Sequence, residues 1–279
     1  SISEKEIFKM EYWPLERAKL NNQLRNILSG NIVVVTGGAG TIGSAIAKKF
    51  LSAEASVVIL DNDLSFRNKL FKEIHGKCLT IKCDLTNEKS IKSAINRIIK
   101  EYGGIDILIS NAGRAYQGKI YDVNEDIIRK SFEINFYSHQ KITQQVIEIM
   151  KIQDSGGNIS FNLSKQSINP GNNFGPYGLP KSSTLFLMKQ YALECGKFNI
   201  KVNGINADRI EGGMLTSKLI NERAKARNIT KDKYMKGNLL KQRVFPEDVA
   251  EAFFNQILLR KTTGNIITVD GGNMEASLR

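Results

Sequence analysis

Tyr177 and Lys181 form a pair that could move a proton. They stand four residues apart, so a helix would place both on one face. The pKa of a free tyrosine is about 10, and a nearby ammonium favours the phenolate, so we expect Lys181 to bring the pKa of Tyr177 closer to working pH. Tyr177 could then take the proton of a substrate alcohol as a hydride leaves its carbon. Ser164 would hold the substrate oxygen, and Asn135 would anchor a water that relays the proton onward. Alone, a pair with this spacing could equally be an ordinary contact on a helix surface.

A glycine-rich stretch, TGGAGTIG at residues 36–43, lies far upstream of this pair. It follows an apolar run and precedes a helical pattern, the context in which glycines let the backbone turn tightly and approach a pyrophosphate. The following helix would offer free N–H groups and the positive end of its dipole to that phosphate. The residues expected to bind a dinucleotide here are Gly37, Gly40, Thr41, Ile42 and Gly43.

Polar or small residues end the next three apolar runs. Asp61 could accept both ribose hydroxyls of an adenosine and would repel a 2′-phosphate, so we expect NAD rather than NADP. Asp84, followed by Leu85, could meet the adenine amino group, or Asp84 could simply be an acid near a helix N-terminus. The fourth run ends in small residues that leave room for a ribose, with an amide that can tie strands together: Asn111, Ala112 and Gly113.

These residues must be positioned by alternating apolar and amphipathic segments. Strands are expected at 32–36, 56–61, 78–83, 105–110, 158–162, 201–206 and 265–269. Helices are expected at 42–53, 64–74, 88–102, 125–150, 177–197 and 246–259. Strict alternation of fully apolar strands with helices predicts an α/β fold, a parallel sheet covered on both faces. In such sheets ligands bind at the carboxyl ends of the strands.

The composition bounds the class of protein. The 279 residues suit one large domain or at most two small ones, and no apolar stretch approaches the roughly 20 residues of a membrane span. A net charge of +12 would also fit an NAD-sensing or nucleic-acid-binding module, but the basic residues are scattered, so we expect no nucleic-acid and no membrane partner. Three cysteines without a pairing pattern fit the cytoplasm. His75 and His139, expected at surface or cap positions, are too few for a histidine-rich site, and no metal is expected.

Together these motifs resemble the short-chain dehydrogenase/reductase family. The resemblance covers nearly all of the chain from Asn31 onward and rests on TGGAGTIG, Asp61, CDLT, SNAG, Asn135, Ser164, YGLPK and TTGNIITVDGGN. It implies one Rossmann-like, doubly wound domain over residues 31–279, with strand order 3-2-1-4-5-6-7. It also implies NAD-dependent oxidation of an alcohol by a homodimer or homotetramer. Residues 1–30 would be an N-terminal extension or a lead between domains.

Further segments resemble the dehydrogenase half of bifunctional aldolase/short-chain dehydrogenases, often described as rhamnulose-1-phosphate aldolase/alcohol dehydrogenase. These segments include EYWPLERAKL, SFNLSKQSINPG and NLLKQRVFPEDVAEAF. In that scheme an aldolase half releases lactaldehyde and the dehydrogenase half oxidises it. The resemblance implies a small hydroxy-aldehyde or sugar-derived alcohol as substrate, and an aldolase joined to this chain or partnered with it. A standalone relative and an excised portion of a longer protein both stay open.

Two places depart from the family's pattern. Thr41 stands where the family has a glycine, and its hydroxyl could reach a phosphate. After the sixth strand, ADRIEG replaces the usual Pro-Gly turn and threonine, so only backbone contacts from Ile210 to the nicotinamide would remain.

Basic residues suggest a second kind of substrate. Arg209 and Lys165 could each meet a substrate carboxylate or phosphate, or Arg209 could pair with Asp208 or Glu211 while Lys165 stays solvated. Residues 214–228, rich in Lys and Arg, resemble the family's mobile lid helix. The alternative function is therefore a dehydrogenase or reductase of a phosphorylated or nucleotide-linked sugar in carbohydrate biosynthesis.

Overall fold

Seven short apolar runs form the strands of one parallel sheet. A computed structural model describes residues 27–65, 78–212 and 215–273. The sheet order is β3-β2-β1-β4-β5-β6-β7, as the family resemblance implies. The strands are β1 (Ile32–Thr36), β2 (Ser56–Asp61), β3 (Cys78–Lys82), β4 (Ile107–Ser110), β5 (Gly157–Asn162), β6 (Ile200–Ala207) and β7 (Ile266–Val269). Each expected strand is present within two residues of its predicted bounds. The predicted α/β fold, Rossmann-like and in one domain, is confirmed.

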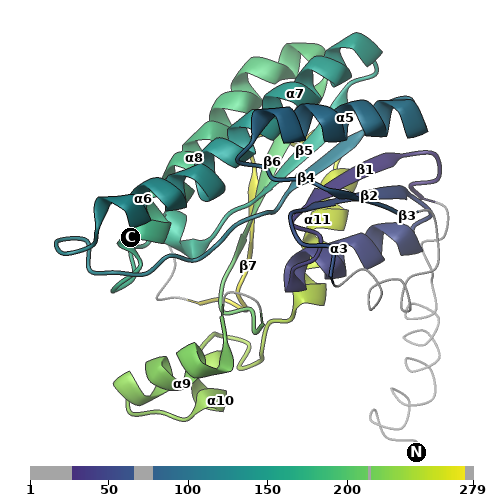
Figure 1. Cartoon of the computed structure of the whole chain (residues 1–279). Coiled ribbons are helices and arrows are strands. Elements are labelled where there is room, and N and C mark those ends of the chain that lie inside the picture. Colours follow the sequence, from purple (N-terminus) through teal and green to yellow (C-terminus); the bar gives the residue numbers. More distant parts are fainter. Residues whose placement is uncertain (1–26, 66–77, 213–214, 274–279) are drawn as a thin grey trace, which may run out of the picture.

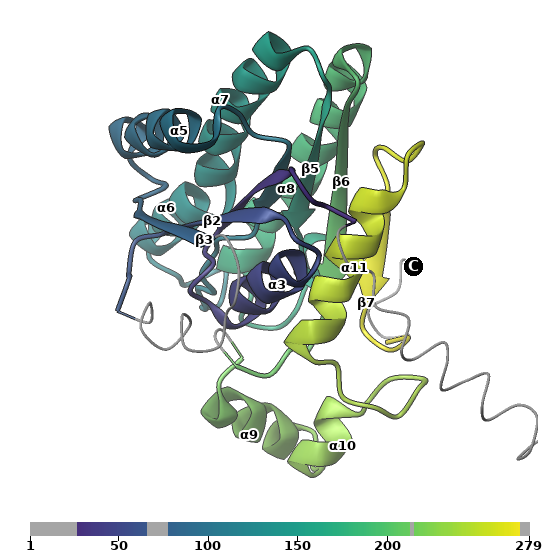
Figure 2. The same cartoon turned by 90° about the vertical axis from the view of Figure 1, so that its right-hand side faces the viewer.

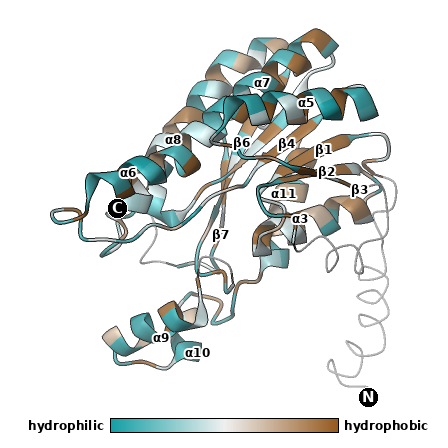
Figure 3. Cartoon of the chain, in the orientation of Figure 1, coloured by the Kyte–Doolittle hydropathy of each residue, from teal (hydrophilic) through white to brown (hydrophobic). Residues whose placement is uncertain are grey.

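Helices cover both faces of the sheet because successive strand residues point to opposite sides. Val33 and Val35 of β1 pack with α3 (Thr41–Ser52) and α11 (Pro246–Leu258). Val34, between them, packs into a second core against three other helices: α5 (Glu88–Tyr102), α7 (Ser138–Gln153) and α8 (Gly175–Cys195). Figures 1 and 2 show the two helical layers with the sheet between them. Colouring by hydropathy places the apolar strands inside and polar helix surfaces outside (Figure 3).

Local signals explain most helix bounds, and one prediction is wrong. Asn87 caps α5 by accepting a hydrogen bond from the Ser90 N–H, and Gly103 ends it with a φ of 85°, so the expected bounds 88–102 hold. The single helix expected over 125–150 is instead α6 (Glu125–Phe132), a short π-helix η2 (Glu133–Tyr137) and α7. The extra residue per turn of a π-helix shifts the side chains that follow, and such turns often occur at functional sites.

A small helical unit projects from the sheet's edge (Figure 1). It consists of α9 (Ser217–Ala226) and α10 (Lys231–Met235), which share a core of their own: Ile220, Ala224, Tyr234 and Met235. The lid helix expected over 214–228 corresponds to α9, although residues 213–214 lie outside the described residues.

Other predictions fall partly outside the described residues. The helix expected at 64–74 overlaps the gap at 66–77, which also contains His75, and most of the 1–30 segment lies in the gap at 1–26. Leu28, just after that gap, is buried in the core between the sheet and helices α3 and α11, and it donates its N–H to the Ala53 carbonyl. Within the described parts of the chain, no helix has the length and apolar character for a membrane span, and no cluster of metal-ligating side chains occurs.

Candidate active site

The carboxyl ends of β1 to β6 border one cleft with a volume of about 1440 Å³. This exceeds the roughly 300–1,000 Å³ usual for one small ligand, so a dinucleotide and a small substrate can be accommodated together. Every residue predicted to act at the site lines this cleft except Asn135. The lining set includes Gly37, Gly40, Thr41, Ile42, Gly43, Asp61, Asp84, Leu85, Asn111, Ala112, Gly113, Ser164, Lys165, Tyr177, Lys181, Arg209 and Ile210.

The glycine turn is closely packed at one end and open at the other. Gly37 has a φ of 62°, and a Cβ on Gly43 would lie 2.2 Å from the Gly37 carbonyl oxygen, so no larger residue fits at either position. Gly40 is the N-cap residue directly before α3, and no side chain caps this helix. The first N–H groups of α3 are therefore free to bind a phosphate, as a pyrophosphate site requires.

Thr41, the departure from the family's glycine, packs against the segment after β6. A Cβ added to Gly212 would lie 3.0 Å from the Thr41 side chain, so the two positions fit each other as a large and a small residue. The cofactor turn therefore contacts the segment that leads to α9.

Asp61 and Asp84 stand at adjacent strand ends. The Asp61 carboxylate accepts hydrogen bonds from the N–H groups of Ala39, at 3.0 Å, and Asp63, at 3.1 Å, which fix it beside the glycine turn. Asp84 accepts from the N–H of Thr86 at 2.9 Å and forms part of the turn before α5, while still lining the cleft. Both expected uses of Asp84 stay open.

Asn111 joins three strands at their carboxyl ends. Its amide donates to the Thr36 carbonyl at 3.0 Å and the Gly37 carbonyl at 3.2 Å, and its oxygen accepts from the Asn162 amide at 2.8 Å. The prediction that Asn111 ties adjacent strands is confirmed, and the floor of the cleft is fixed by these bonds.

Ser164, Tyr177 and Lys181 meet at the centre of the cleft. The Tyr177 hydroxyl is hydrogen-bonded to the Ser164 side chain. The Lys181 ammonium lies 6.0 Å from the Tyr177 ring centroid and donates to the Asn162 carbonyl at 2.8 Å. Only 6% of Tyr177 and 2% of Lys181 is exposed.

The expectation that Lys181 brings the pKa of Tyr177 closer to working pH is wrong. Burial raises the pKa of Tyr177 to about 12, although the hydrogen bond from Ser164 opposes the rise. Burial also lowers the pKa of Lys181 to about 7, so the ammonium is only partly charged near neutral pH. Burial removes the Tyr177 phenol and the Lys181 amine from water, and this disfavours the phenolate and the ammonium more than their proximity to each other favours them.

Asn135 lies behind the cleft, in the π-helix, and is fully buried. Its amide donates to the Arg114 carbonyl at 2.8 Å, its side-chain oxygen accepts from the Arg114 N–H at 3.0 Å, and its backbone carbonyl accepts from the Thr184 hydroxyl at 2.6 Å. Asn135 thus fastens the loop after β4 to α8. Its role as the anchor of a relay water stays a prediction.

His139 is buried, so the expectation of a surface or cap position is wrong. Its Nδ1 lies 2.7 Å from the Ser110 hydroxyl, its ring packs 5.9 Å from that of Phe161, and burial lowers its pKa well below the usual value. The signal was present in the sequence, because Ile142 and Val146 place His139 on the apolar face of α7.

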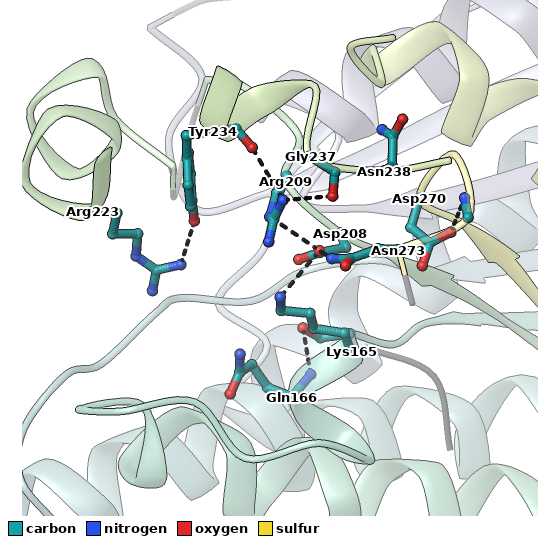
Figure 4. Close-up of polar contacts among 12 residues, drawn as sticks. Lys165, Gln166, Asp208, Arg209, Arg223, Tyr234, Gly237, Asn238, Asp270 and Asn273 are labelled. Carbon is teal, nitrogen blue, oxygen red and sulfur yellow. Dashed lines mark hydrogen bonds and ion pairs between the residues drawn. The ribbon is translucent and has the colours of Figure 1, made fainter. Parts of the chain in front are cut away.

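The substrate candidates share one carboxylate at the end of β6. Lys165 pairs with Asp208 at 3.1 Å, and the Nε of Arg209 lies 3.6 Å from the same oxygen (Figure 4). Arg209 also donates to the carbonyls of Tyr234 and Gly237, both at 3.1 Å. The alternative of a loop ion pair between Arg209 and Asp208 is thus present, and Lys165 is paired rather than solvated; contact of either residue with a substrate stays a prediction. The further lining residues that were not named from the sequence include Tyr116, Gln166 and Phe174, and also Arg223, which lies within the predicted lid helix.

Comparison with known proteins gives matches over almost the whole fold. A family model described as short chain dehydrogenase matches residues 31–223. The chain is 34% identical, over 98% of its length, to the uncharacterized oxidoreductase YuxG of Bacillus subtilis (strain 168), of which it spans 42%. It is also 29% identical to the 7alpha-hydroxysteroid dehydrogenase of Escherichia coli (strain K12), over 89% of this chain and 96% of that protein.

Solved structures show the same fold. A 7alpha-hydroxysteroid dehydrogenase in complex with NADH and 7-oxo glycochenodeoxycholic acid has a TM-score of 0.79 and 28% identity, covering 90% of this chain and 96% of that chain. The 3-ketoacyl-(acyl-carrier-protein) reductase of Brucella melitensis in complex with NADH also has a TM-score of 0.79, at 23% identity, covering 88% of this chain and 98% of that chain. At this lower identity the likeness concerns the fold alone.

Proposed function

Because the chain belongs to the short-chain dehydrogenase family, we propose that it is an NAD-dependent oxidoreductase acting on CH–OH groups, with Tyr177 as acid and base. One observation carries the proposal. The hydrogen-bonded pair of Ser164 and Tyr177 lies in the same cleft as the uncapped N-terminus of α3. The group proposed to transfer the proton and the helix end proposed to bind phosphate thus line one cleft.

The residues of the cleft fit NAD. The free N–H groups of α3 would hold the pyrophosphate. Gly37 and Gly43 have no side chain that could keep the phosphate away from the backbone, and their close packing excludes a larger residue. Asp61 would accept hydrogen bonds from the ribose hydroxyls. When bound, NAD would supply the acceptor for the hydride that leaves the substrate carbon. A carboxylate at Asp61 disfavours NADP, because a 2′-phosphate would meet a like charge.

Tyr177 performs the proton transfer from its hydroxyl oxygen. With its pKa raised by burial, the phenol holds its proton at neutral pH and is ready to donate it to a substrate carbonyl. In the opposite direction the phenol must first lose that proton, which additional positive charge in the cleft makes easier. Ser164 orients the reacting oxygen beside the phenol.

Two substrate classes are supported by different features. A small hydroxy-aldehyde or sugar-derived alcohol, such as lactaldehyde, and a linked or partnered aldolase are suggested by the resemblance of the sequence segments to the dehydrogenase half of aldolase/dehydrogenases. A phosphorylated or nucleotide-linked sugar is favoured by the basic side chains of Lys165, Arg209 and Arg223 in the cleft wall.

Self-association in the cytoplasm completes the proposal. Leu179, Phe186 and Leu193 recur every seven residues on α8 and are 47%, 70% and 77% exposed, so they form one apolar stripe along the helix. Such a stripe suits a homodimer or homotetramer. All three cysteines are free thiols, which fits a reducing compartment.

The test is a substrate screen with NAD and NADP in parallel, using L-lactaldehyde, six-carbon sugars and their phosphates. Tyr177→Phe should lower turnover by about 10²–10⁴-fold while NADH still binds. Tyr191→Phe is the matched control, because Tyr191 is a buried tyrosine on the same helix that does not line the cleft. Unchanged turnover in Tyr177→Phe would show that the proposed mechanism is wrong.

A further inference from the structure

A second cavity, of about 460 Å³, adjoins the cleft between α9 and the loop at 168–174. Its wall carries four basic side chains and a single carboxylate: Lys165, Arg209, Arg223, Arg227 and Glu222. Lys165, Arg209 and Arg223 line the main cleft as well, so a molecule that reacts at Tyr177 could extend into this cavity.

Arg223 is held in place without an acidic partner. Its guanidinium lies 4.3 Å from the centroid of the Phe174 ring and donates to the Tyr234 hydroxyl at 3.1 Å (Figure 4). Among the described residues it makes no ion pair with a carboxylate. Aromatic stacking therefore orients the guanidinium and leaves its charge available to a ligand.

Phe174 connects this charge to the reacting centre. The Phe174 ring packs edge-on against the Tyr177 ring, with centroids 6.4 Å apart, and the same Phe174 ring stacks with the Arg223 guanidinium. One aromatic ring thus separates the guanidinium from the proton-transfer group. Arg223 and Tyr177 both line the cleft, so one substrate molecule could contact both.

The neighbouring charges do not neutralise the cavity. Lys165 and Arg209 both contact the Asp208 carboxylate, and these three side chains together carry a net positive charge. Gln166 is only 8% exposed and lines both cavities; its side-chain oxygen has no hydrogen-bond partner in the described residues and could accept a hydrogen bond from a substrate hydroxyl. Figure 4 shows Lys165 and Gln166 below Asp208 and Arg209, with Arg223 reaching in from the ribbon of α9.

We propose that this cavity binds an oxyanion carried by the substrate, a phosphate or a carboxylate, and that Arg223 is the residue that pairs with it. The planar guanidinium presents two parallel N–H donors to such a group. The inference rests on the proposed function and narrows it to an alcohol or carbonyl compound that bears an anionic group a few carbons from the reacting carbon. An uncharged hydroxy-aldehyde would leave the cavity's positive charge uncompensated.

The test compares matched substrates on the full chain with NAD: a sugar phosphate with its free sugar, and a hydroxy acid with its amide. Arg223→Met should lower kcat/KM for the charged member of the preferred pair by about 10–100-fold, and for the neutral member by less than about twofold. Lys225→Met is the control, because it removes an equal charge from an exposed position on α9 that lines neither cavity. The preferred pair identifies the anion as phosphate or carboxylate.

A second measurement does not depend on turnover. Inorganic phosphate or acetate, added separately, should raise the melting temperature of the wild type and of Tyr177→Phe, but not of Arg223→Met. If Arg223→Met does not fold, Arg223→Lys takes its place and should weaken both effects several-fold. Preference for the neutral substrates, or equal losses on both members of a pair, would overturn the inference even if Tyr177→Phe is inactive. An active Tyr177→Phe would instead overturn the proposed mechanism.

Discussion

Substitution of Gly40 by alanine should separate cofactor binding from folding. Gly40 has φ and ψ of −70° and 168°, which any residue adopts, and an added Cβ would meet only the Gly37 carbonyl oxygen, at 3.4 Å. Alanine has fewer conformations than glycine in the unfolded chain, which stabilises the folded protein by roughly 0.4–1 kcal/mol. Alanine is also a poorer N-cap residue than glycine, which destabilises the folded protein by roughly 0.5–1 kcal/mol. The free energy of unfolding should therefore stay within about 1 kcal/mol of wild type.

The same methyl group would project into the cleft at the uncapped end of α3, where a pyrophosphate must approach the backbone. We expect the Kd for NADH to rise at least about tenfold, a loss of about 1.4 kcal/mol. Fluorescence titration with NADH measures the Kd, and thermal unfolding without cofactor measures stability. Wild-type affinity in a folded Gly40→Ala protein would show that the pyrophosphate does not pass this residue.

Gly43→Ala is the contrasting variant in the same turn. Its Cβ would lie 2.2 Å from the Gly37 carbonyl oxygen and 2.7 Å from the Gly38 Cα, both backbone atoms that cannot move without displacing the turn. Overpacking of this kind costs about 1–3 kcal/mol or more, so the melting temperature should fall by several degrees. If Gly43→Ala melts like the wild type while Gly40→Ala is destabilised, the packing argument is refuted.

Three further predictions concern charge and assembly. The pKa of Lys181 is about 7 in the folded protein and 10.5 in the unfolded chain. Between these pH values the unfolded chain binds more protons, so the free energy of unfolding should rise with pH by at most about 1.4 kcal/mol per pH unit. Lys181→Met should flatten this rise in urea unfolding at pH 7–10, and an unchanged slope would contradict the cause. Asp61→Asn should shift the ratio of the NADH and NADPH Kd values at least about tenfold towards NADPH, since a like charge is removed; a constant ratio would argue against contact with the ribose. Phe186→Glu combined with Leu193→Glu should convert the proposed oligomer to monomers in light scattering, and a monomeric wild type would refute the role of this stripe.

The sheet was predictable because its strands are buried on both faces and therefore read as continuous apolar runs. The order of the strands came from the family resemblance, since apolar runs alone do not specify neighbours. The π-helix at Glu133–Tyr137 was not predicted. One extra residue in a turn leaves the helical pattern on either side intact, so the sequence shows a single helix where the structure has three segments.

The cleft was predictable to the extent that its residues end strands. Parallel strands bring their carboxyl ends to one edge, so Asp61, Asn111 and Ser164 meet in the cleft although they are distant in sequence. Burial was not predictable from spacing, and it reverses the expected direction of the pKa of Tyr177. The predicted lid helix included Arg223, but the contact of Arg223 with Phe174 was not predictable, because it depends on how α9 returns over the cleft.

The separate core of α9 and α10 has a consequence for the order of events in turnover. Four side chains, Ile220, Ala224, Tyr234 and Met235, hold this unit together, whereas the sheet is held by two much larger cores. Cooperative units with small cores open at lower free energy than the whole protein. Amide hydrogens of α9 and α10 should thus exchange through openings that leave the glycine turn folded. If, as proposed, a dinucleotide lies at the glycine turn and the substrate lies under α9, the product could depart while the dinucleotide stays in place, and the two would then leave in separate steps.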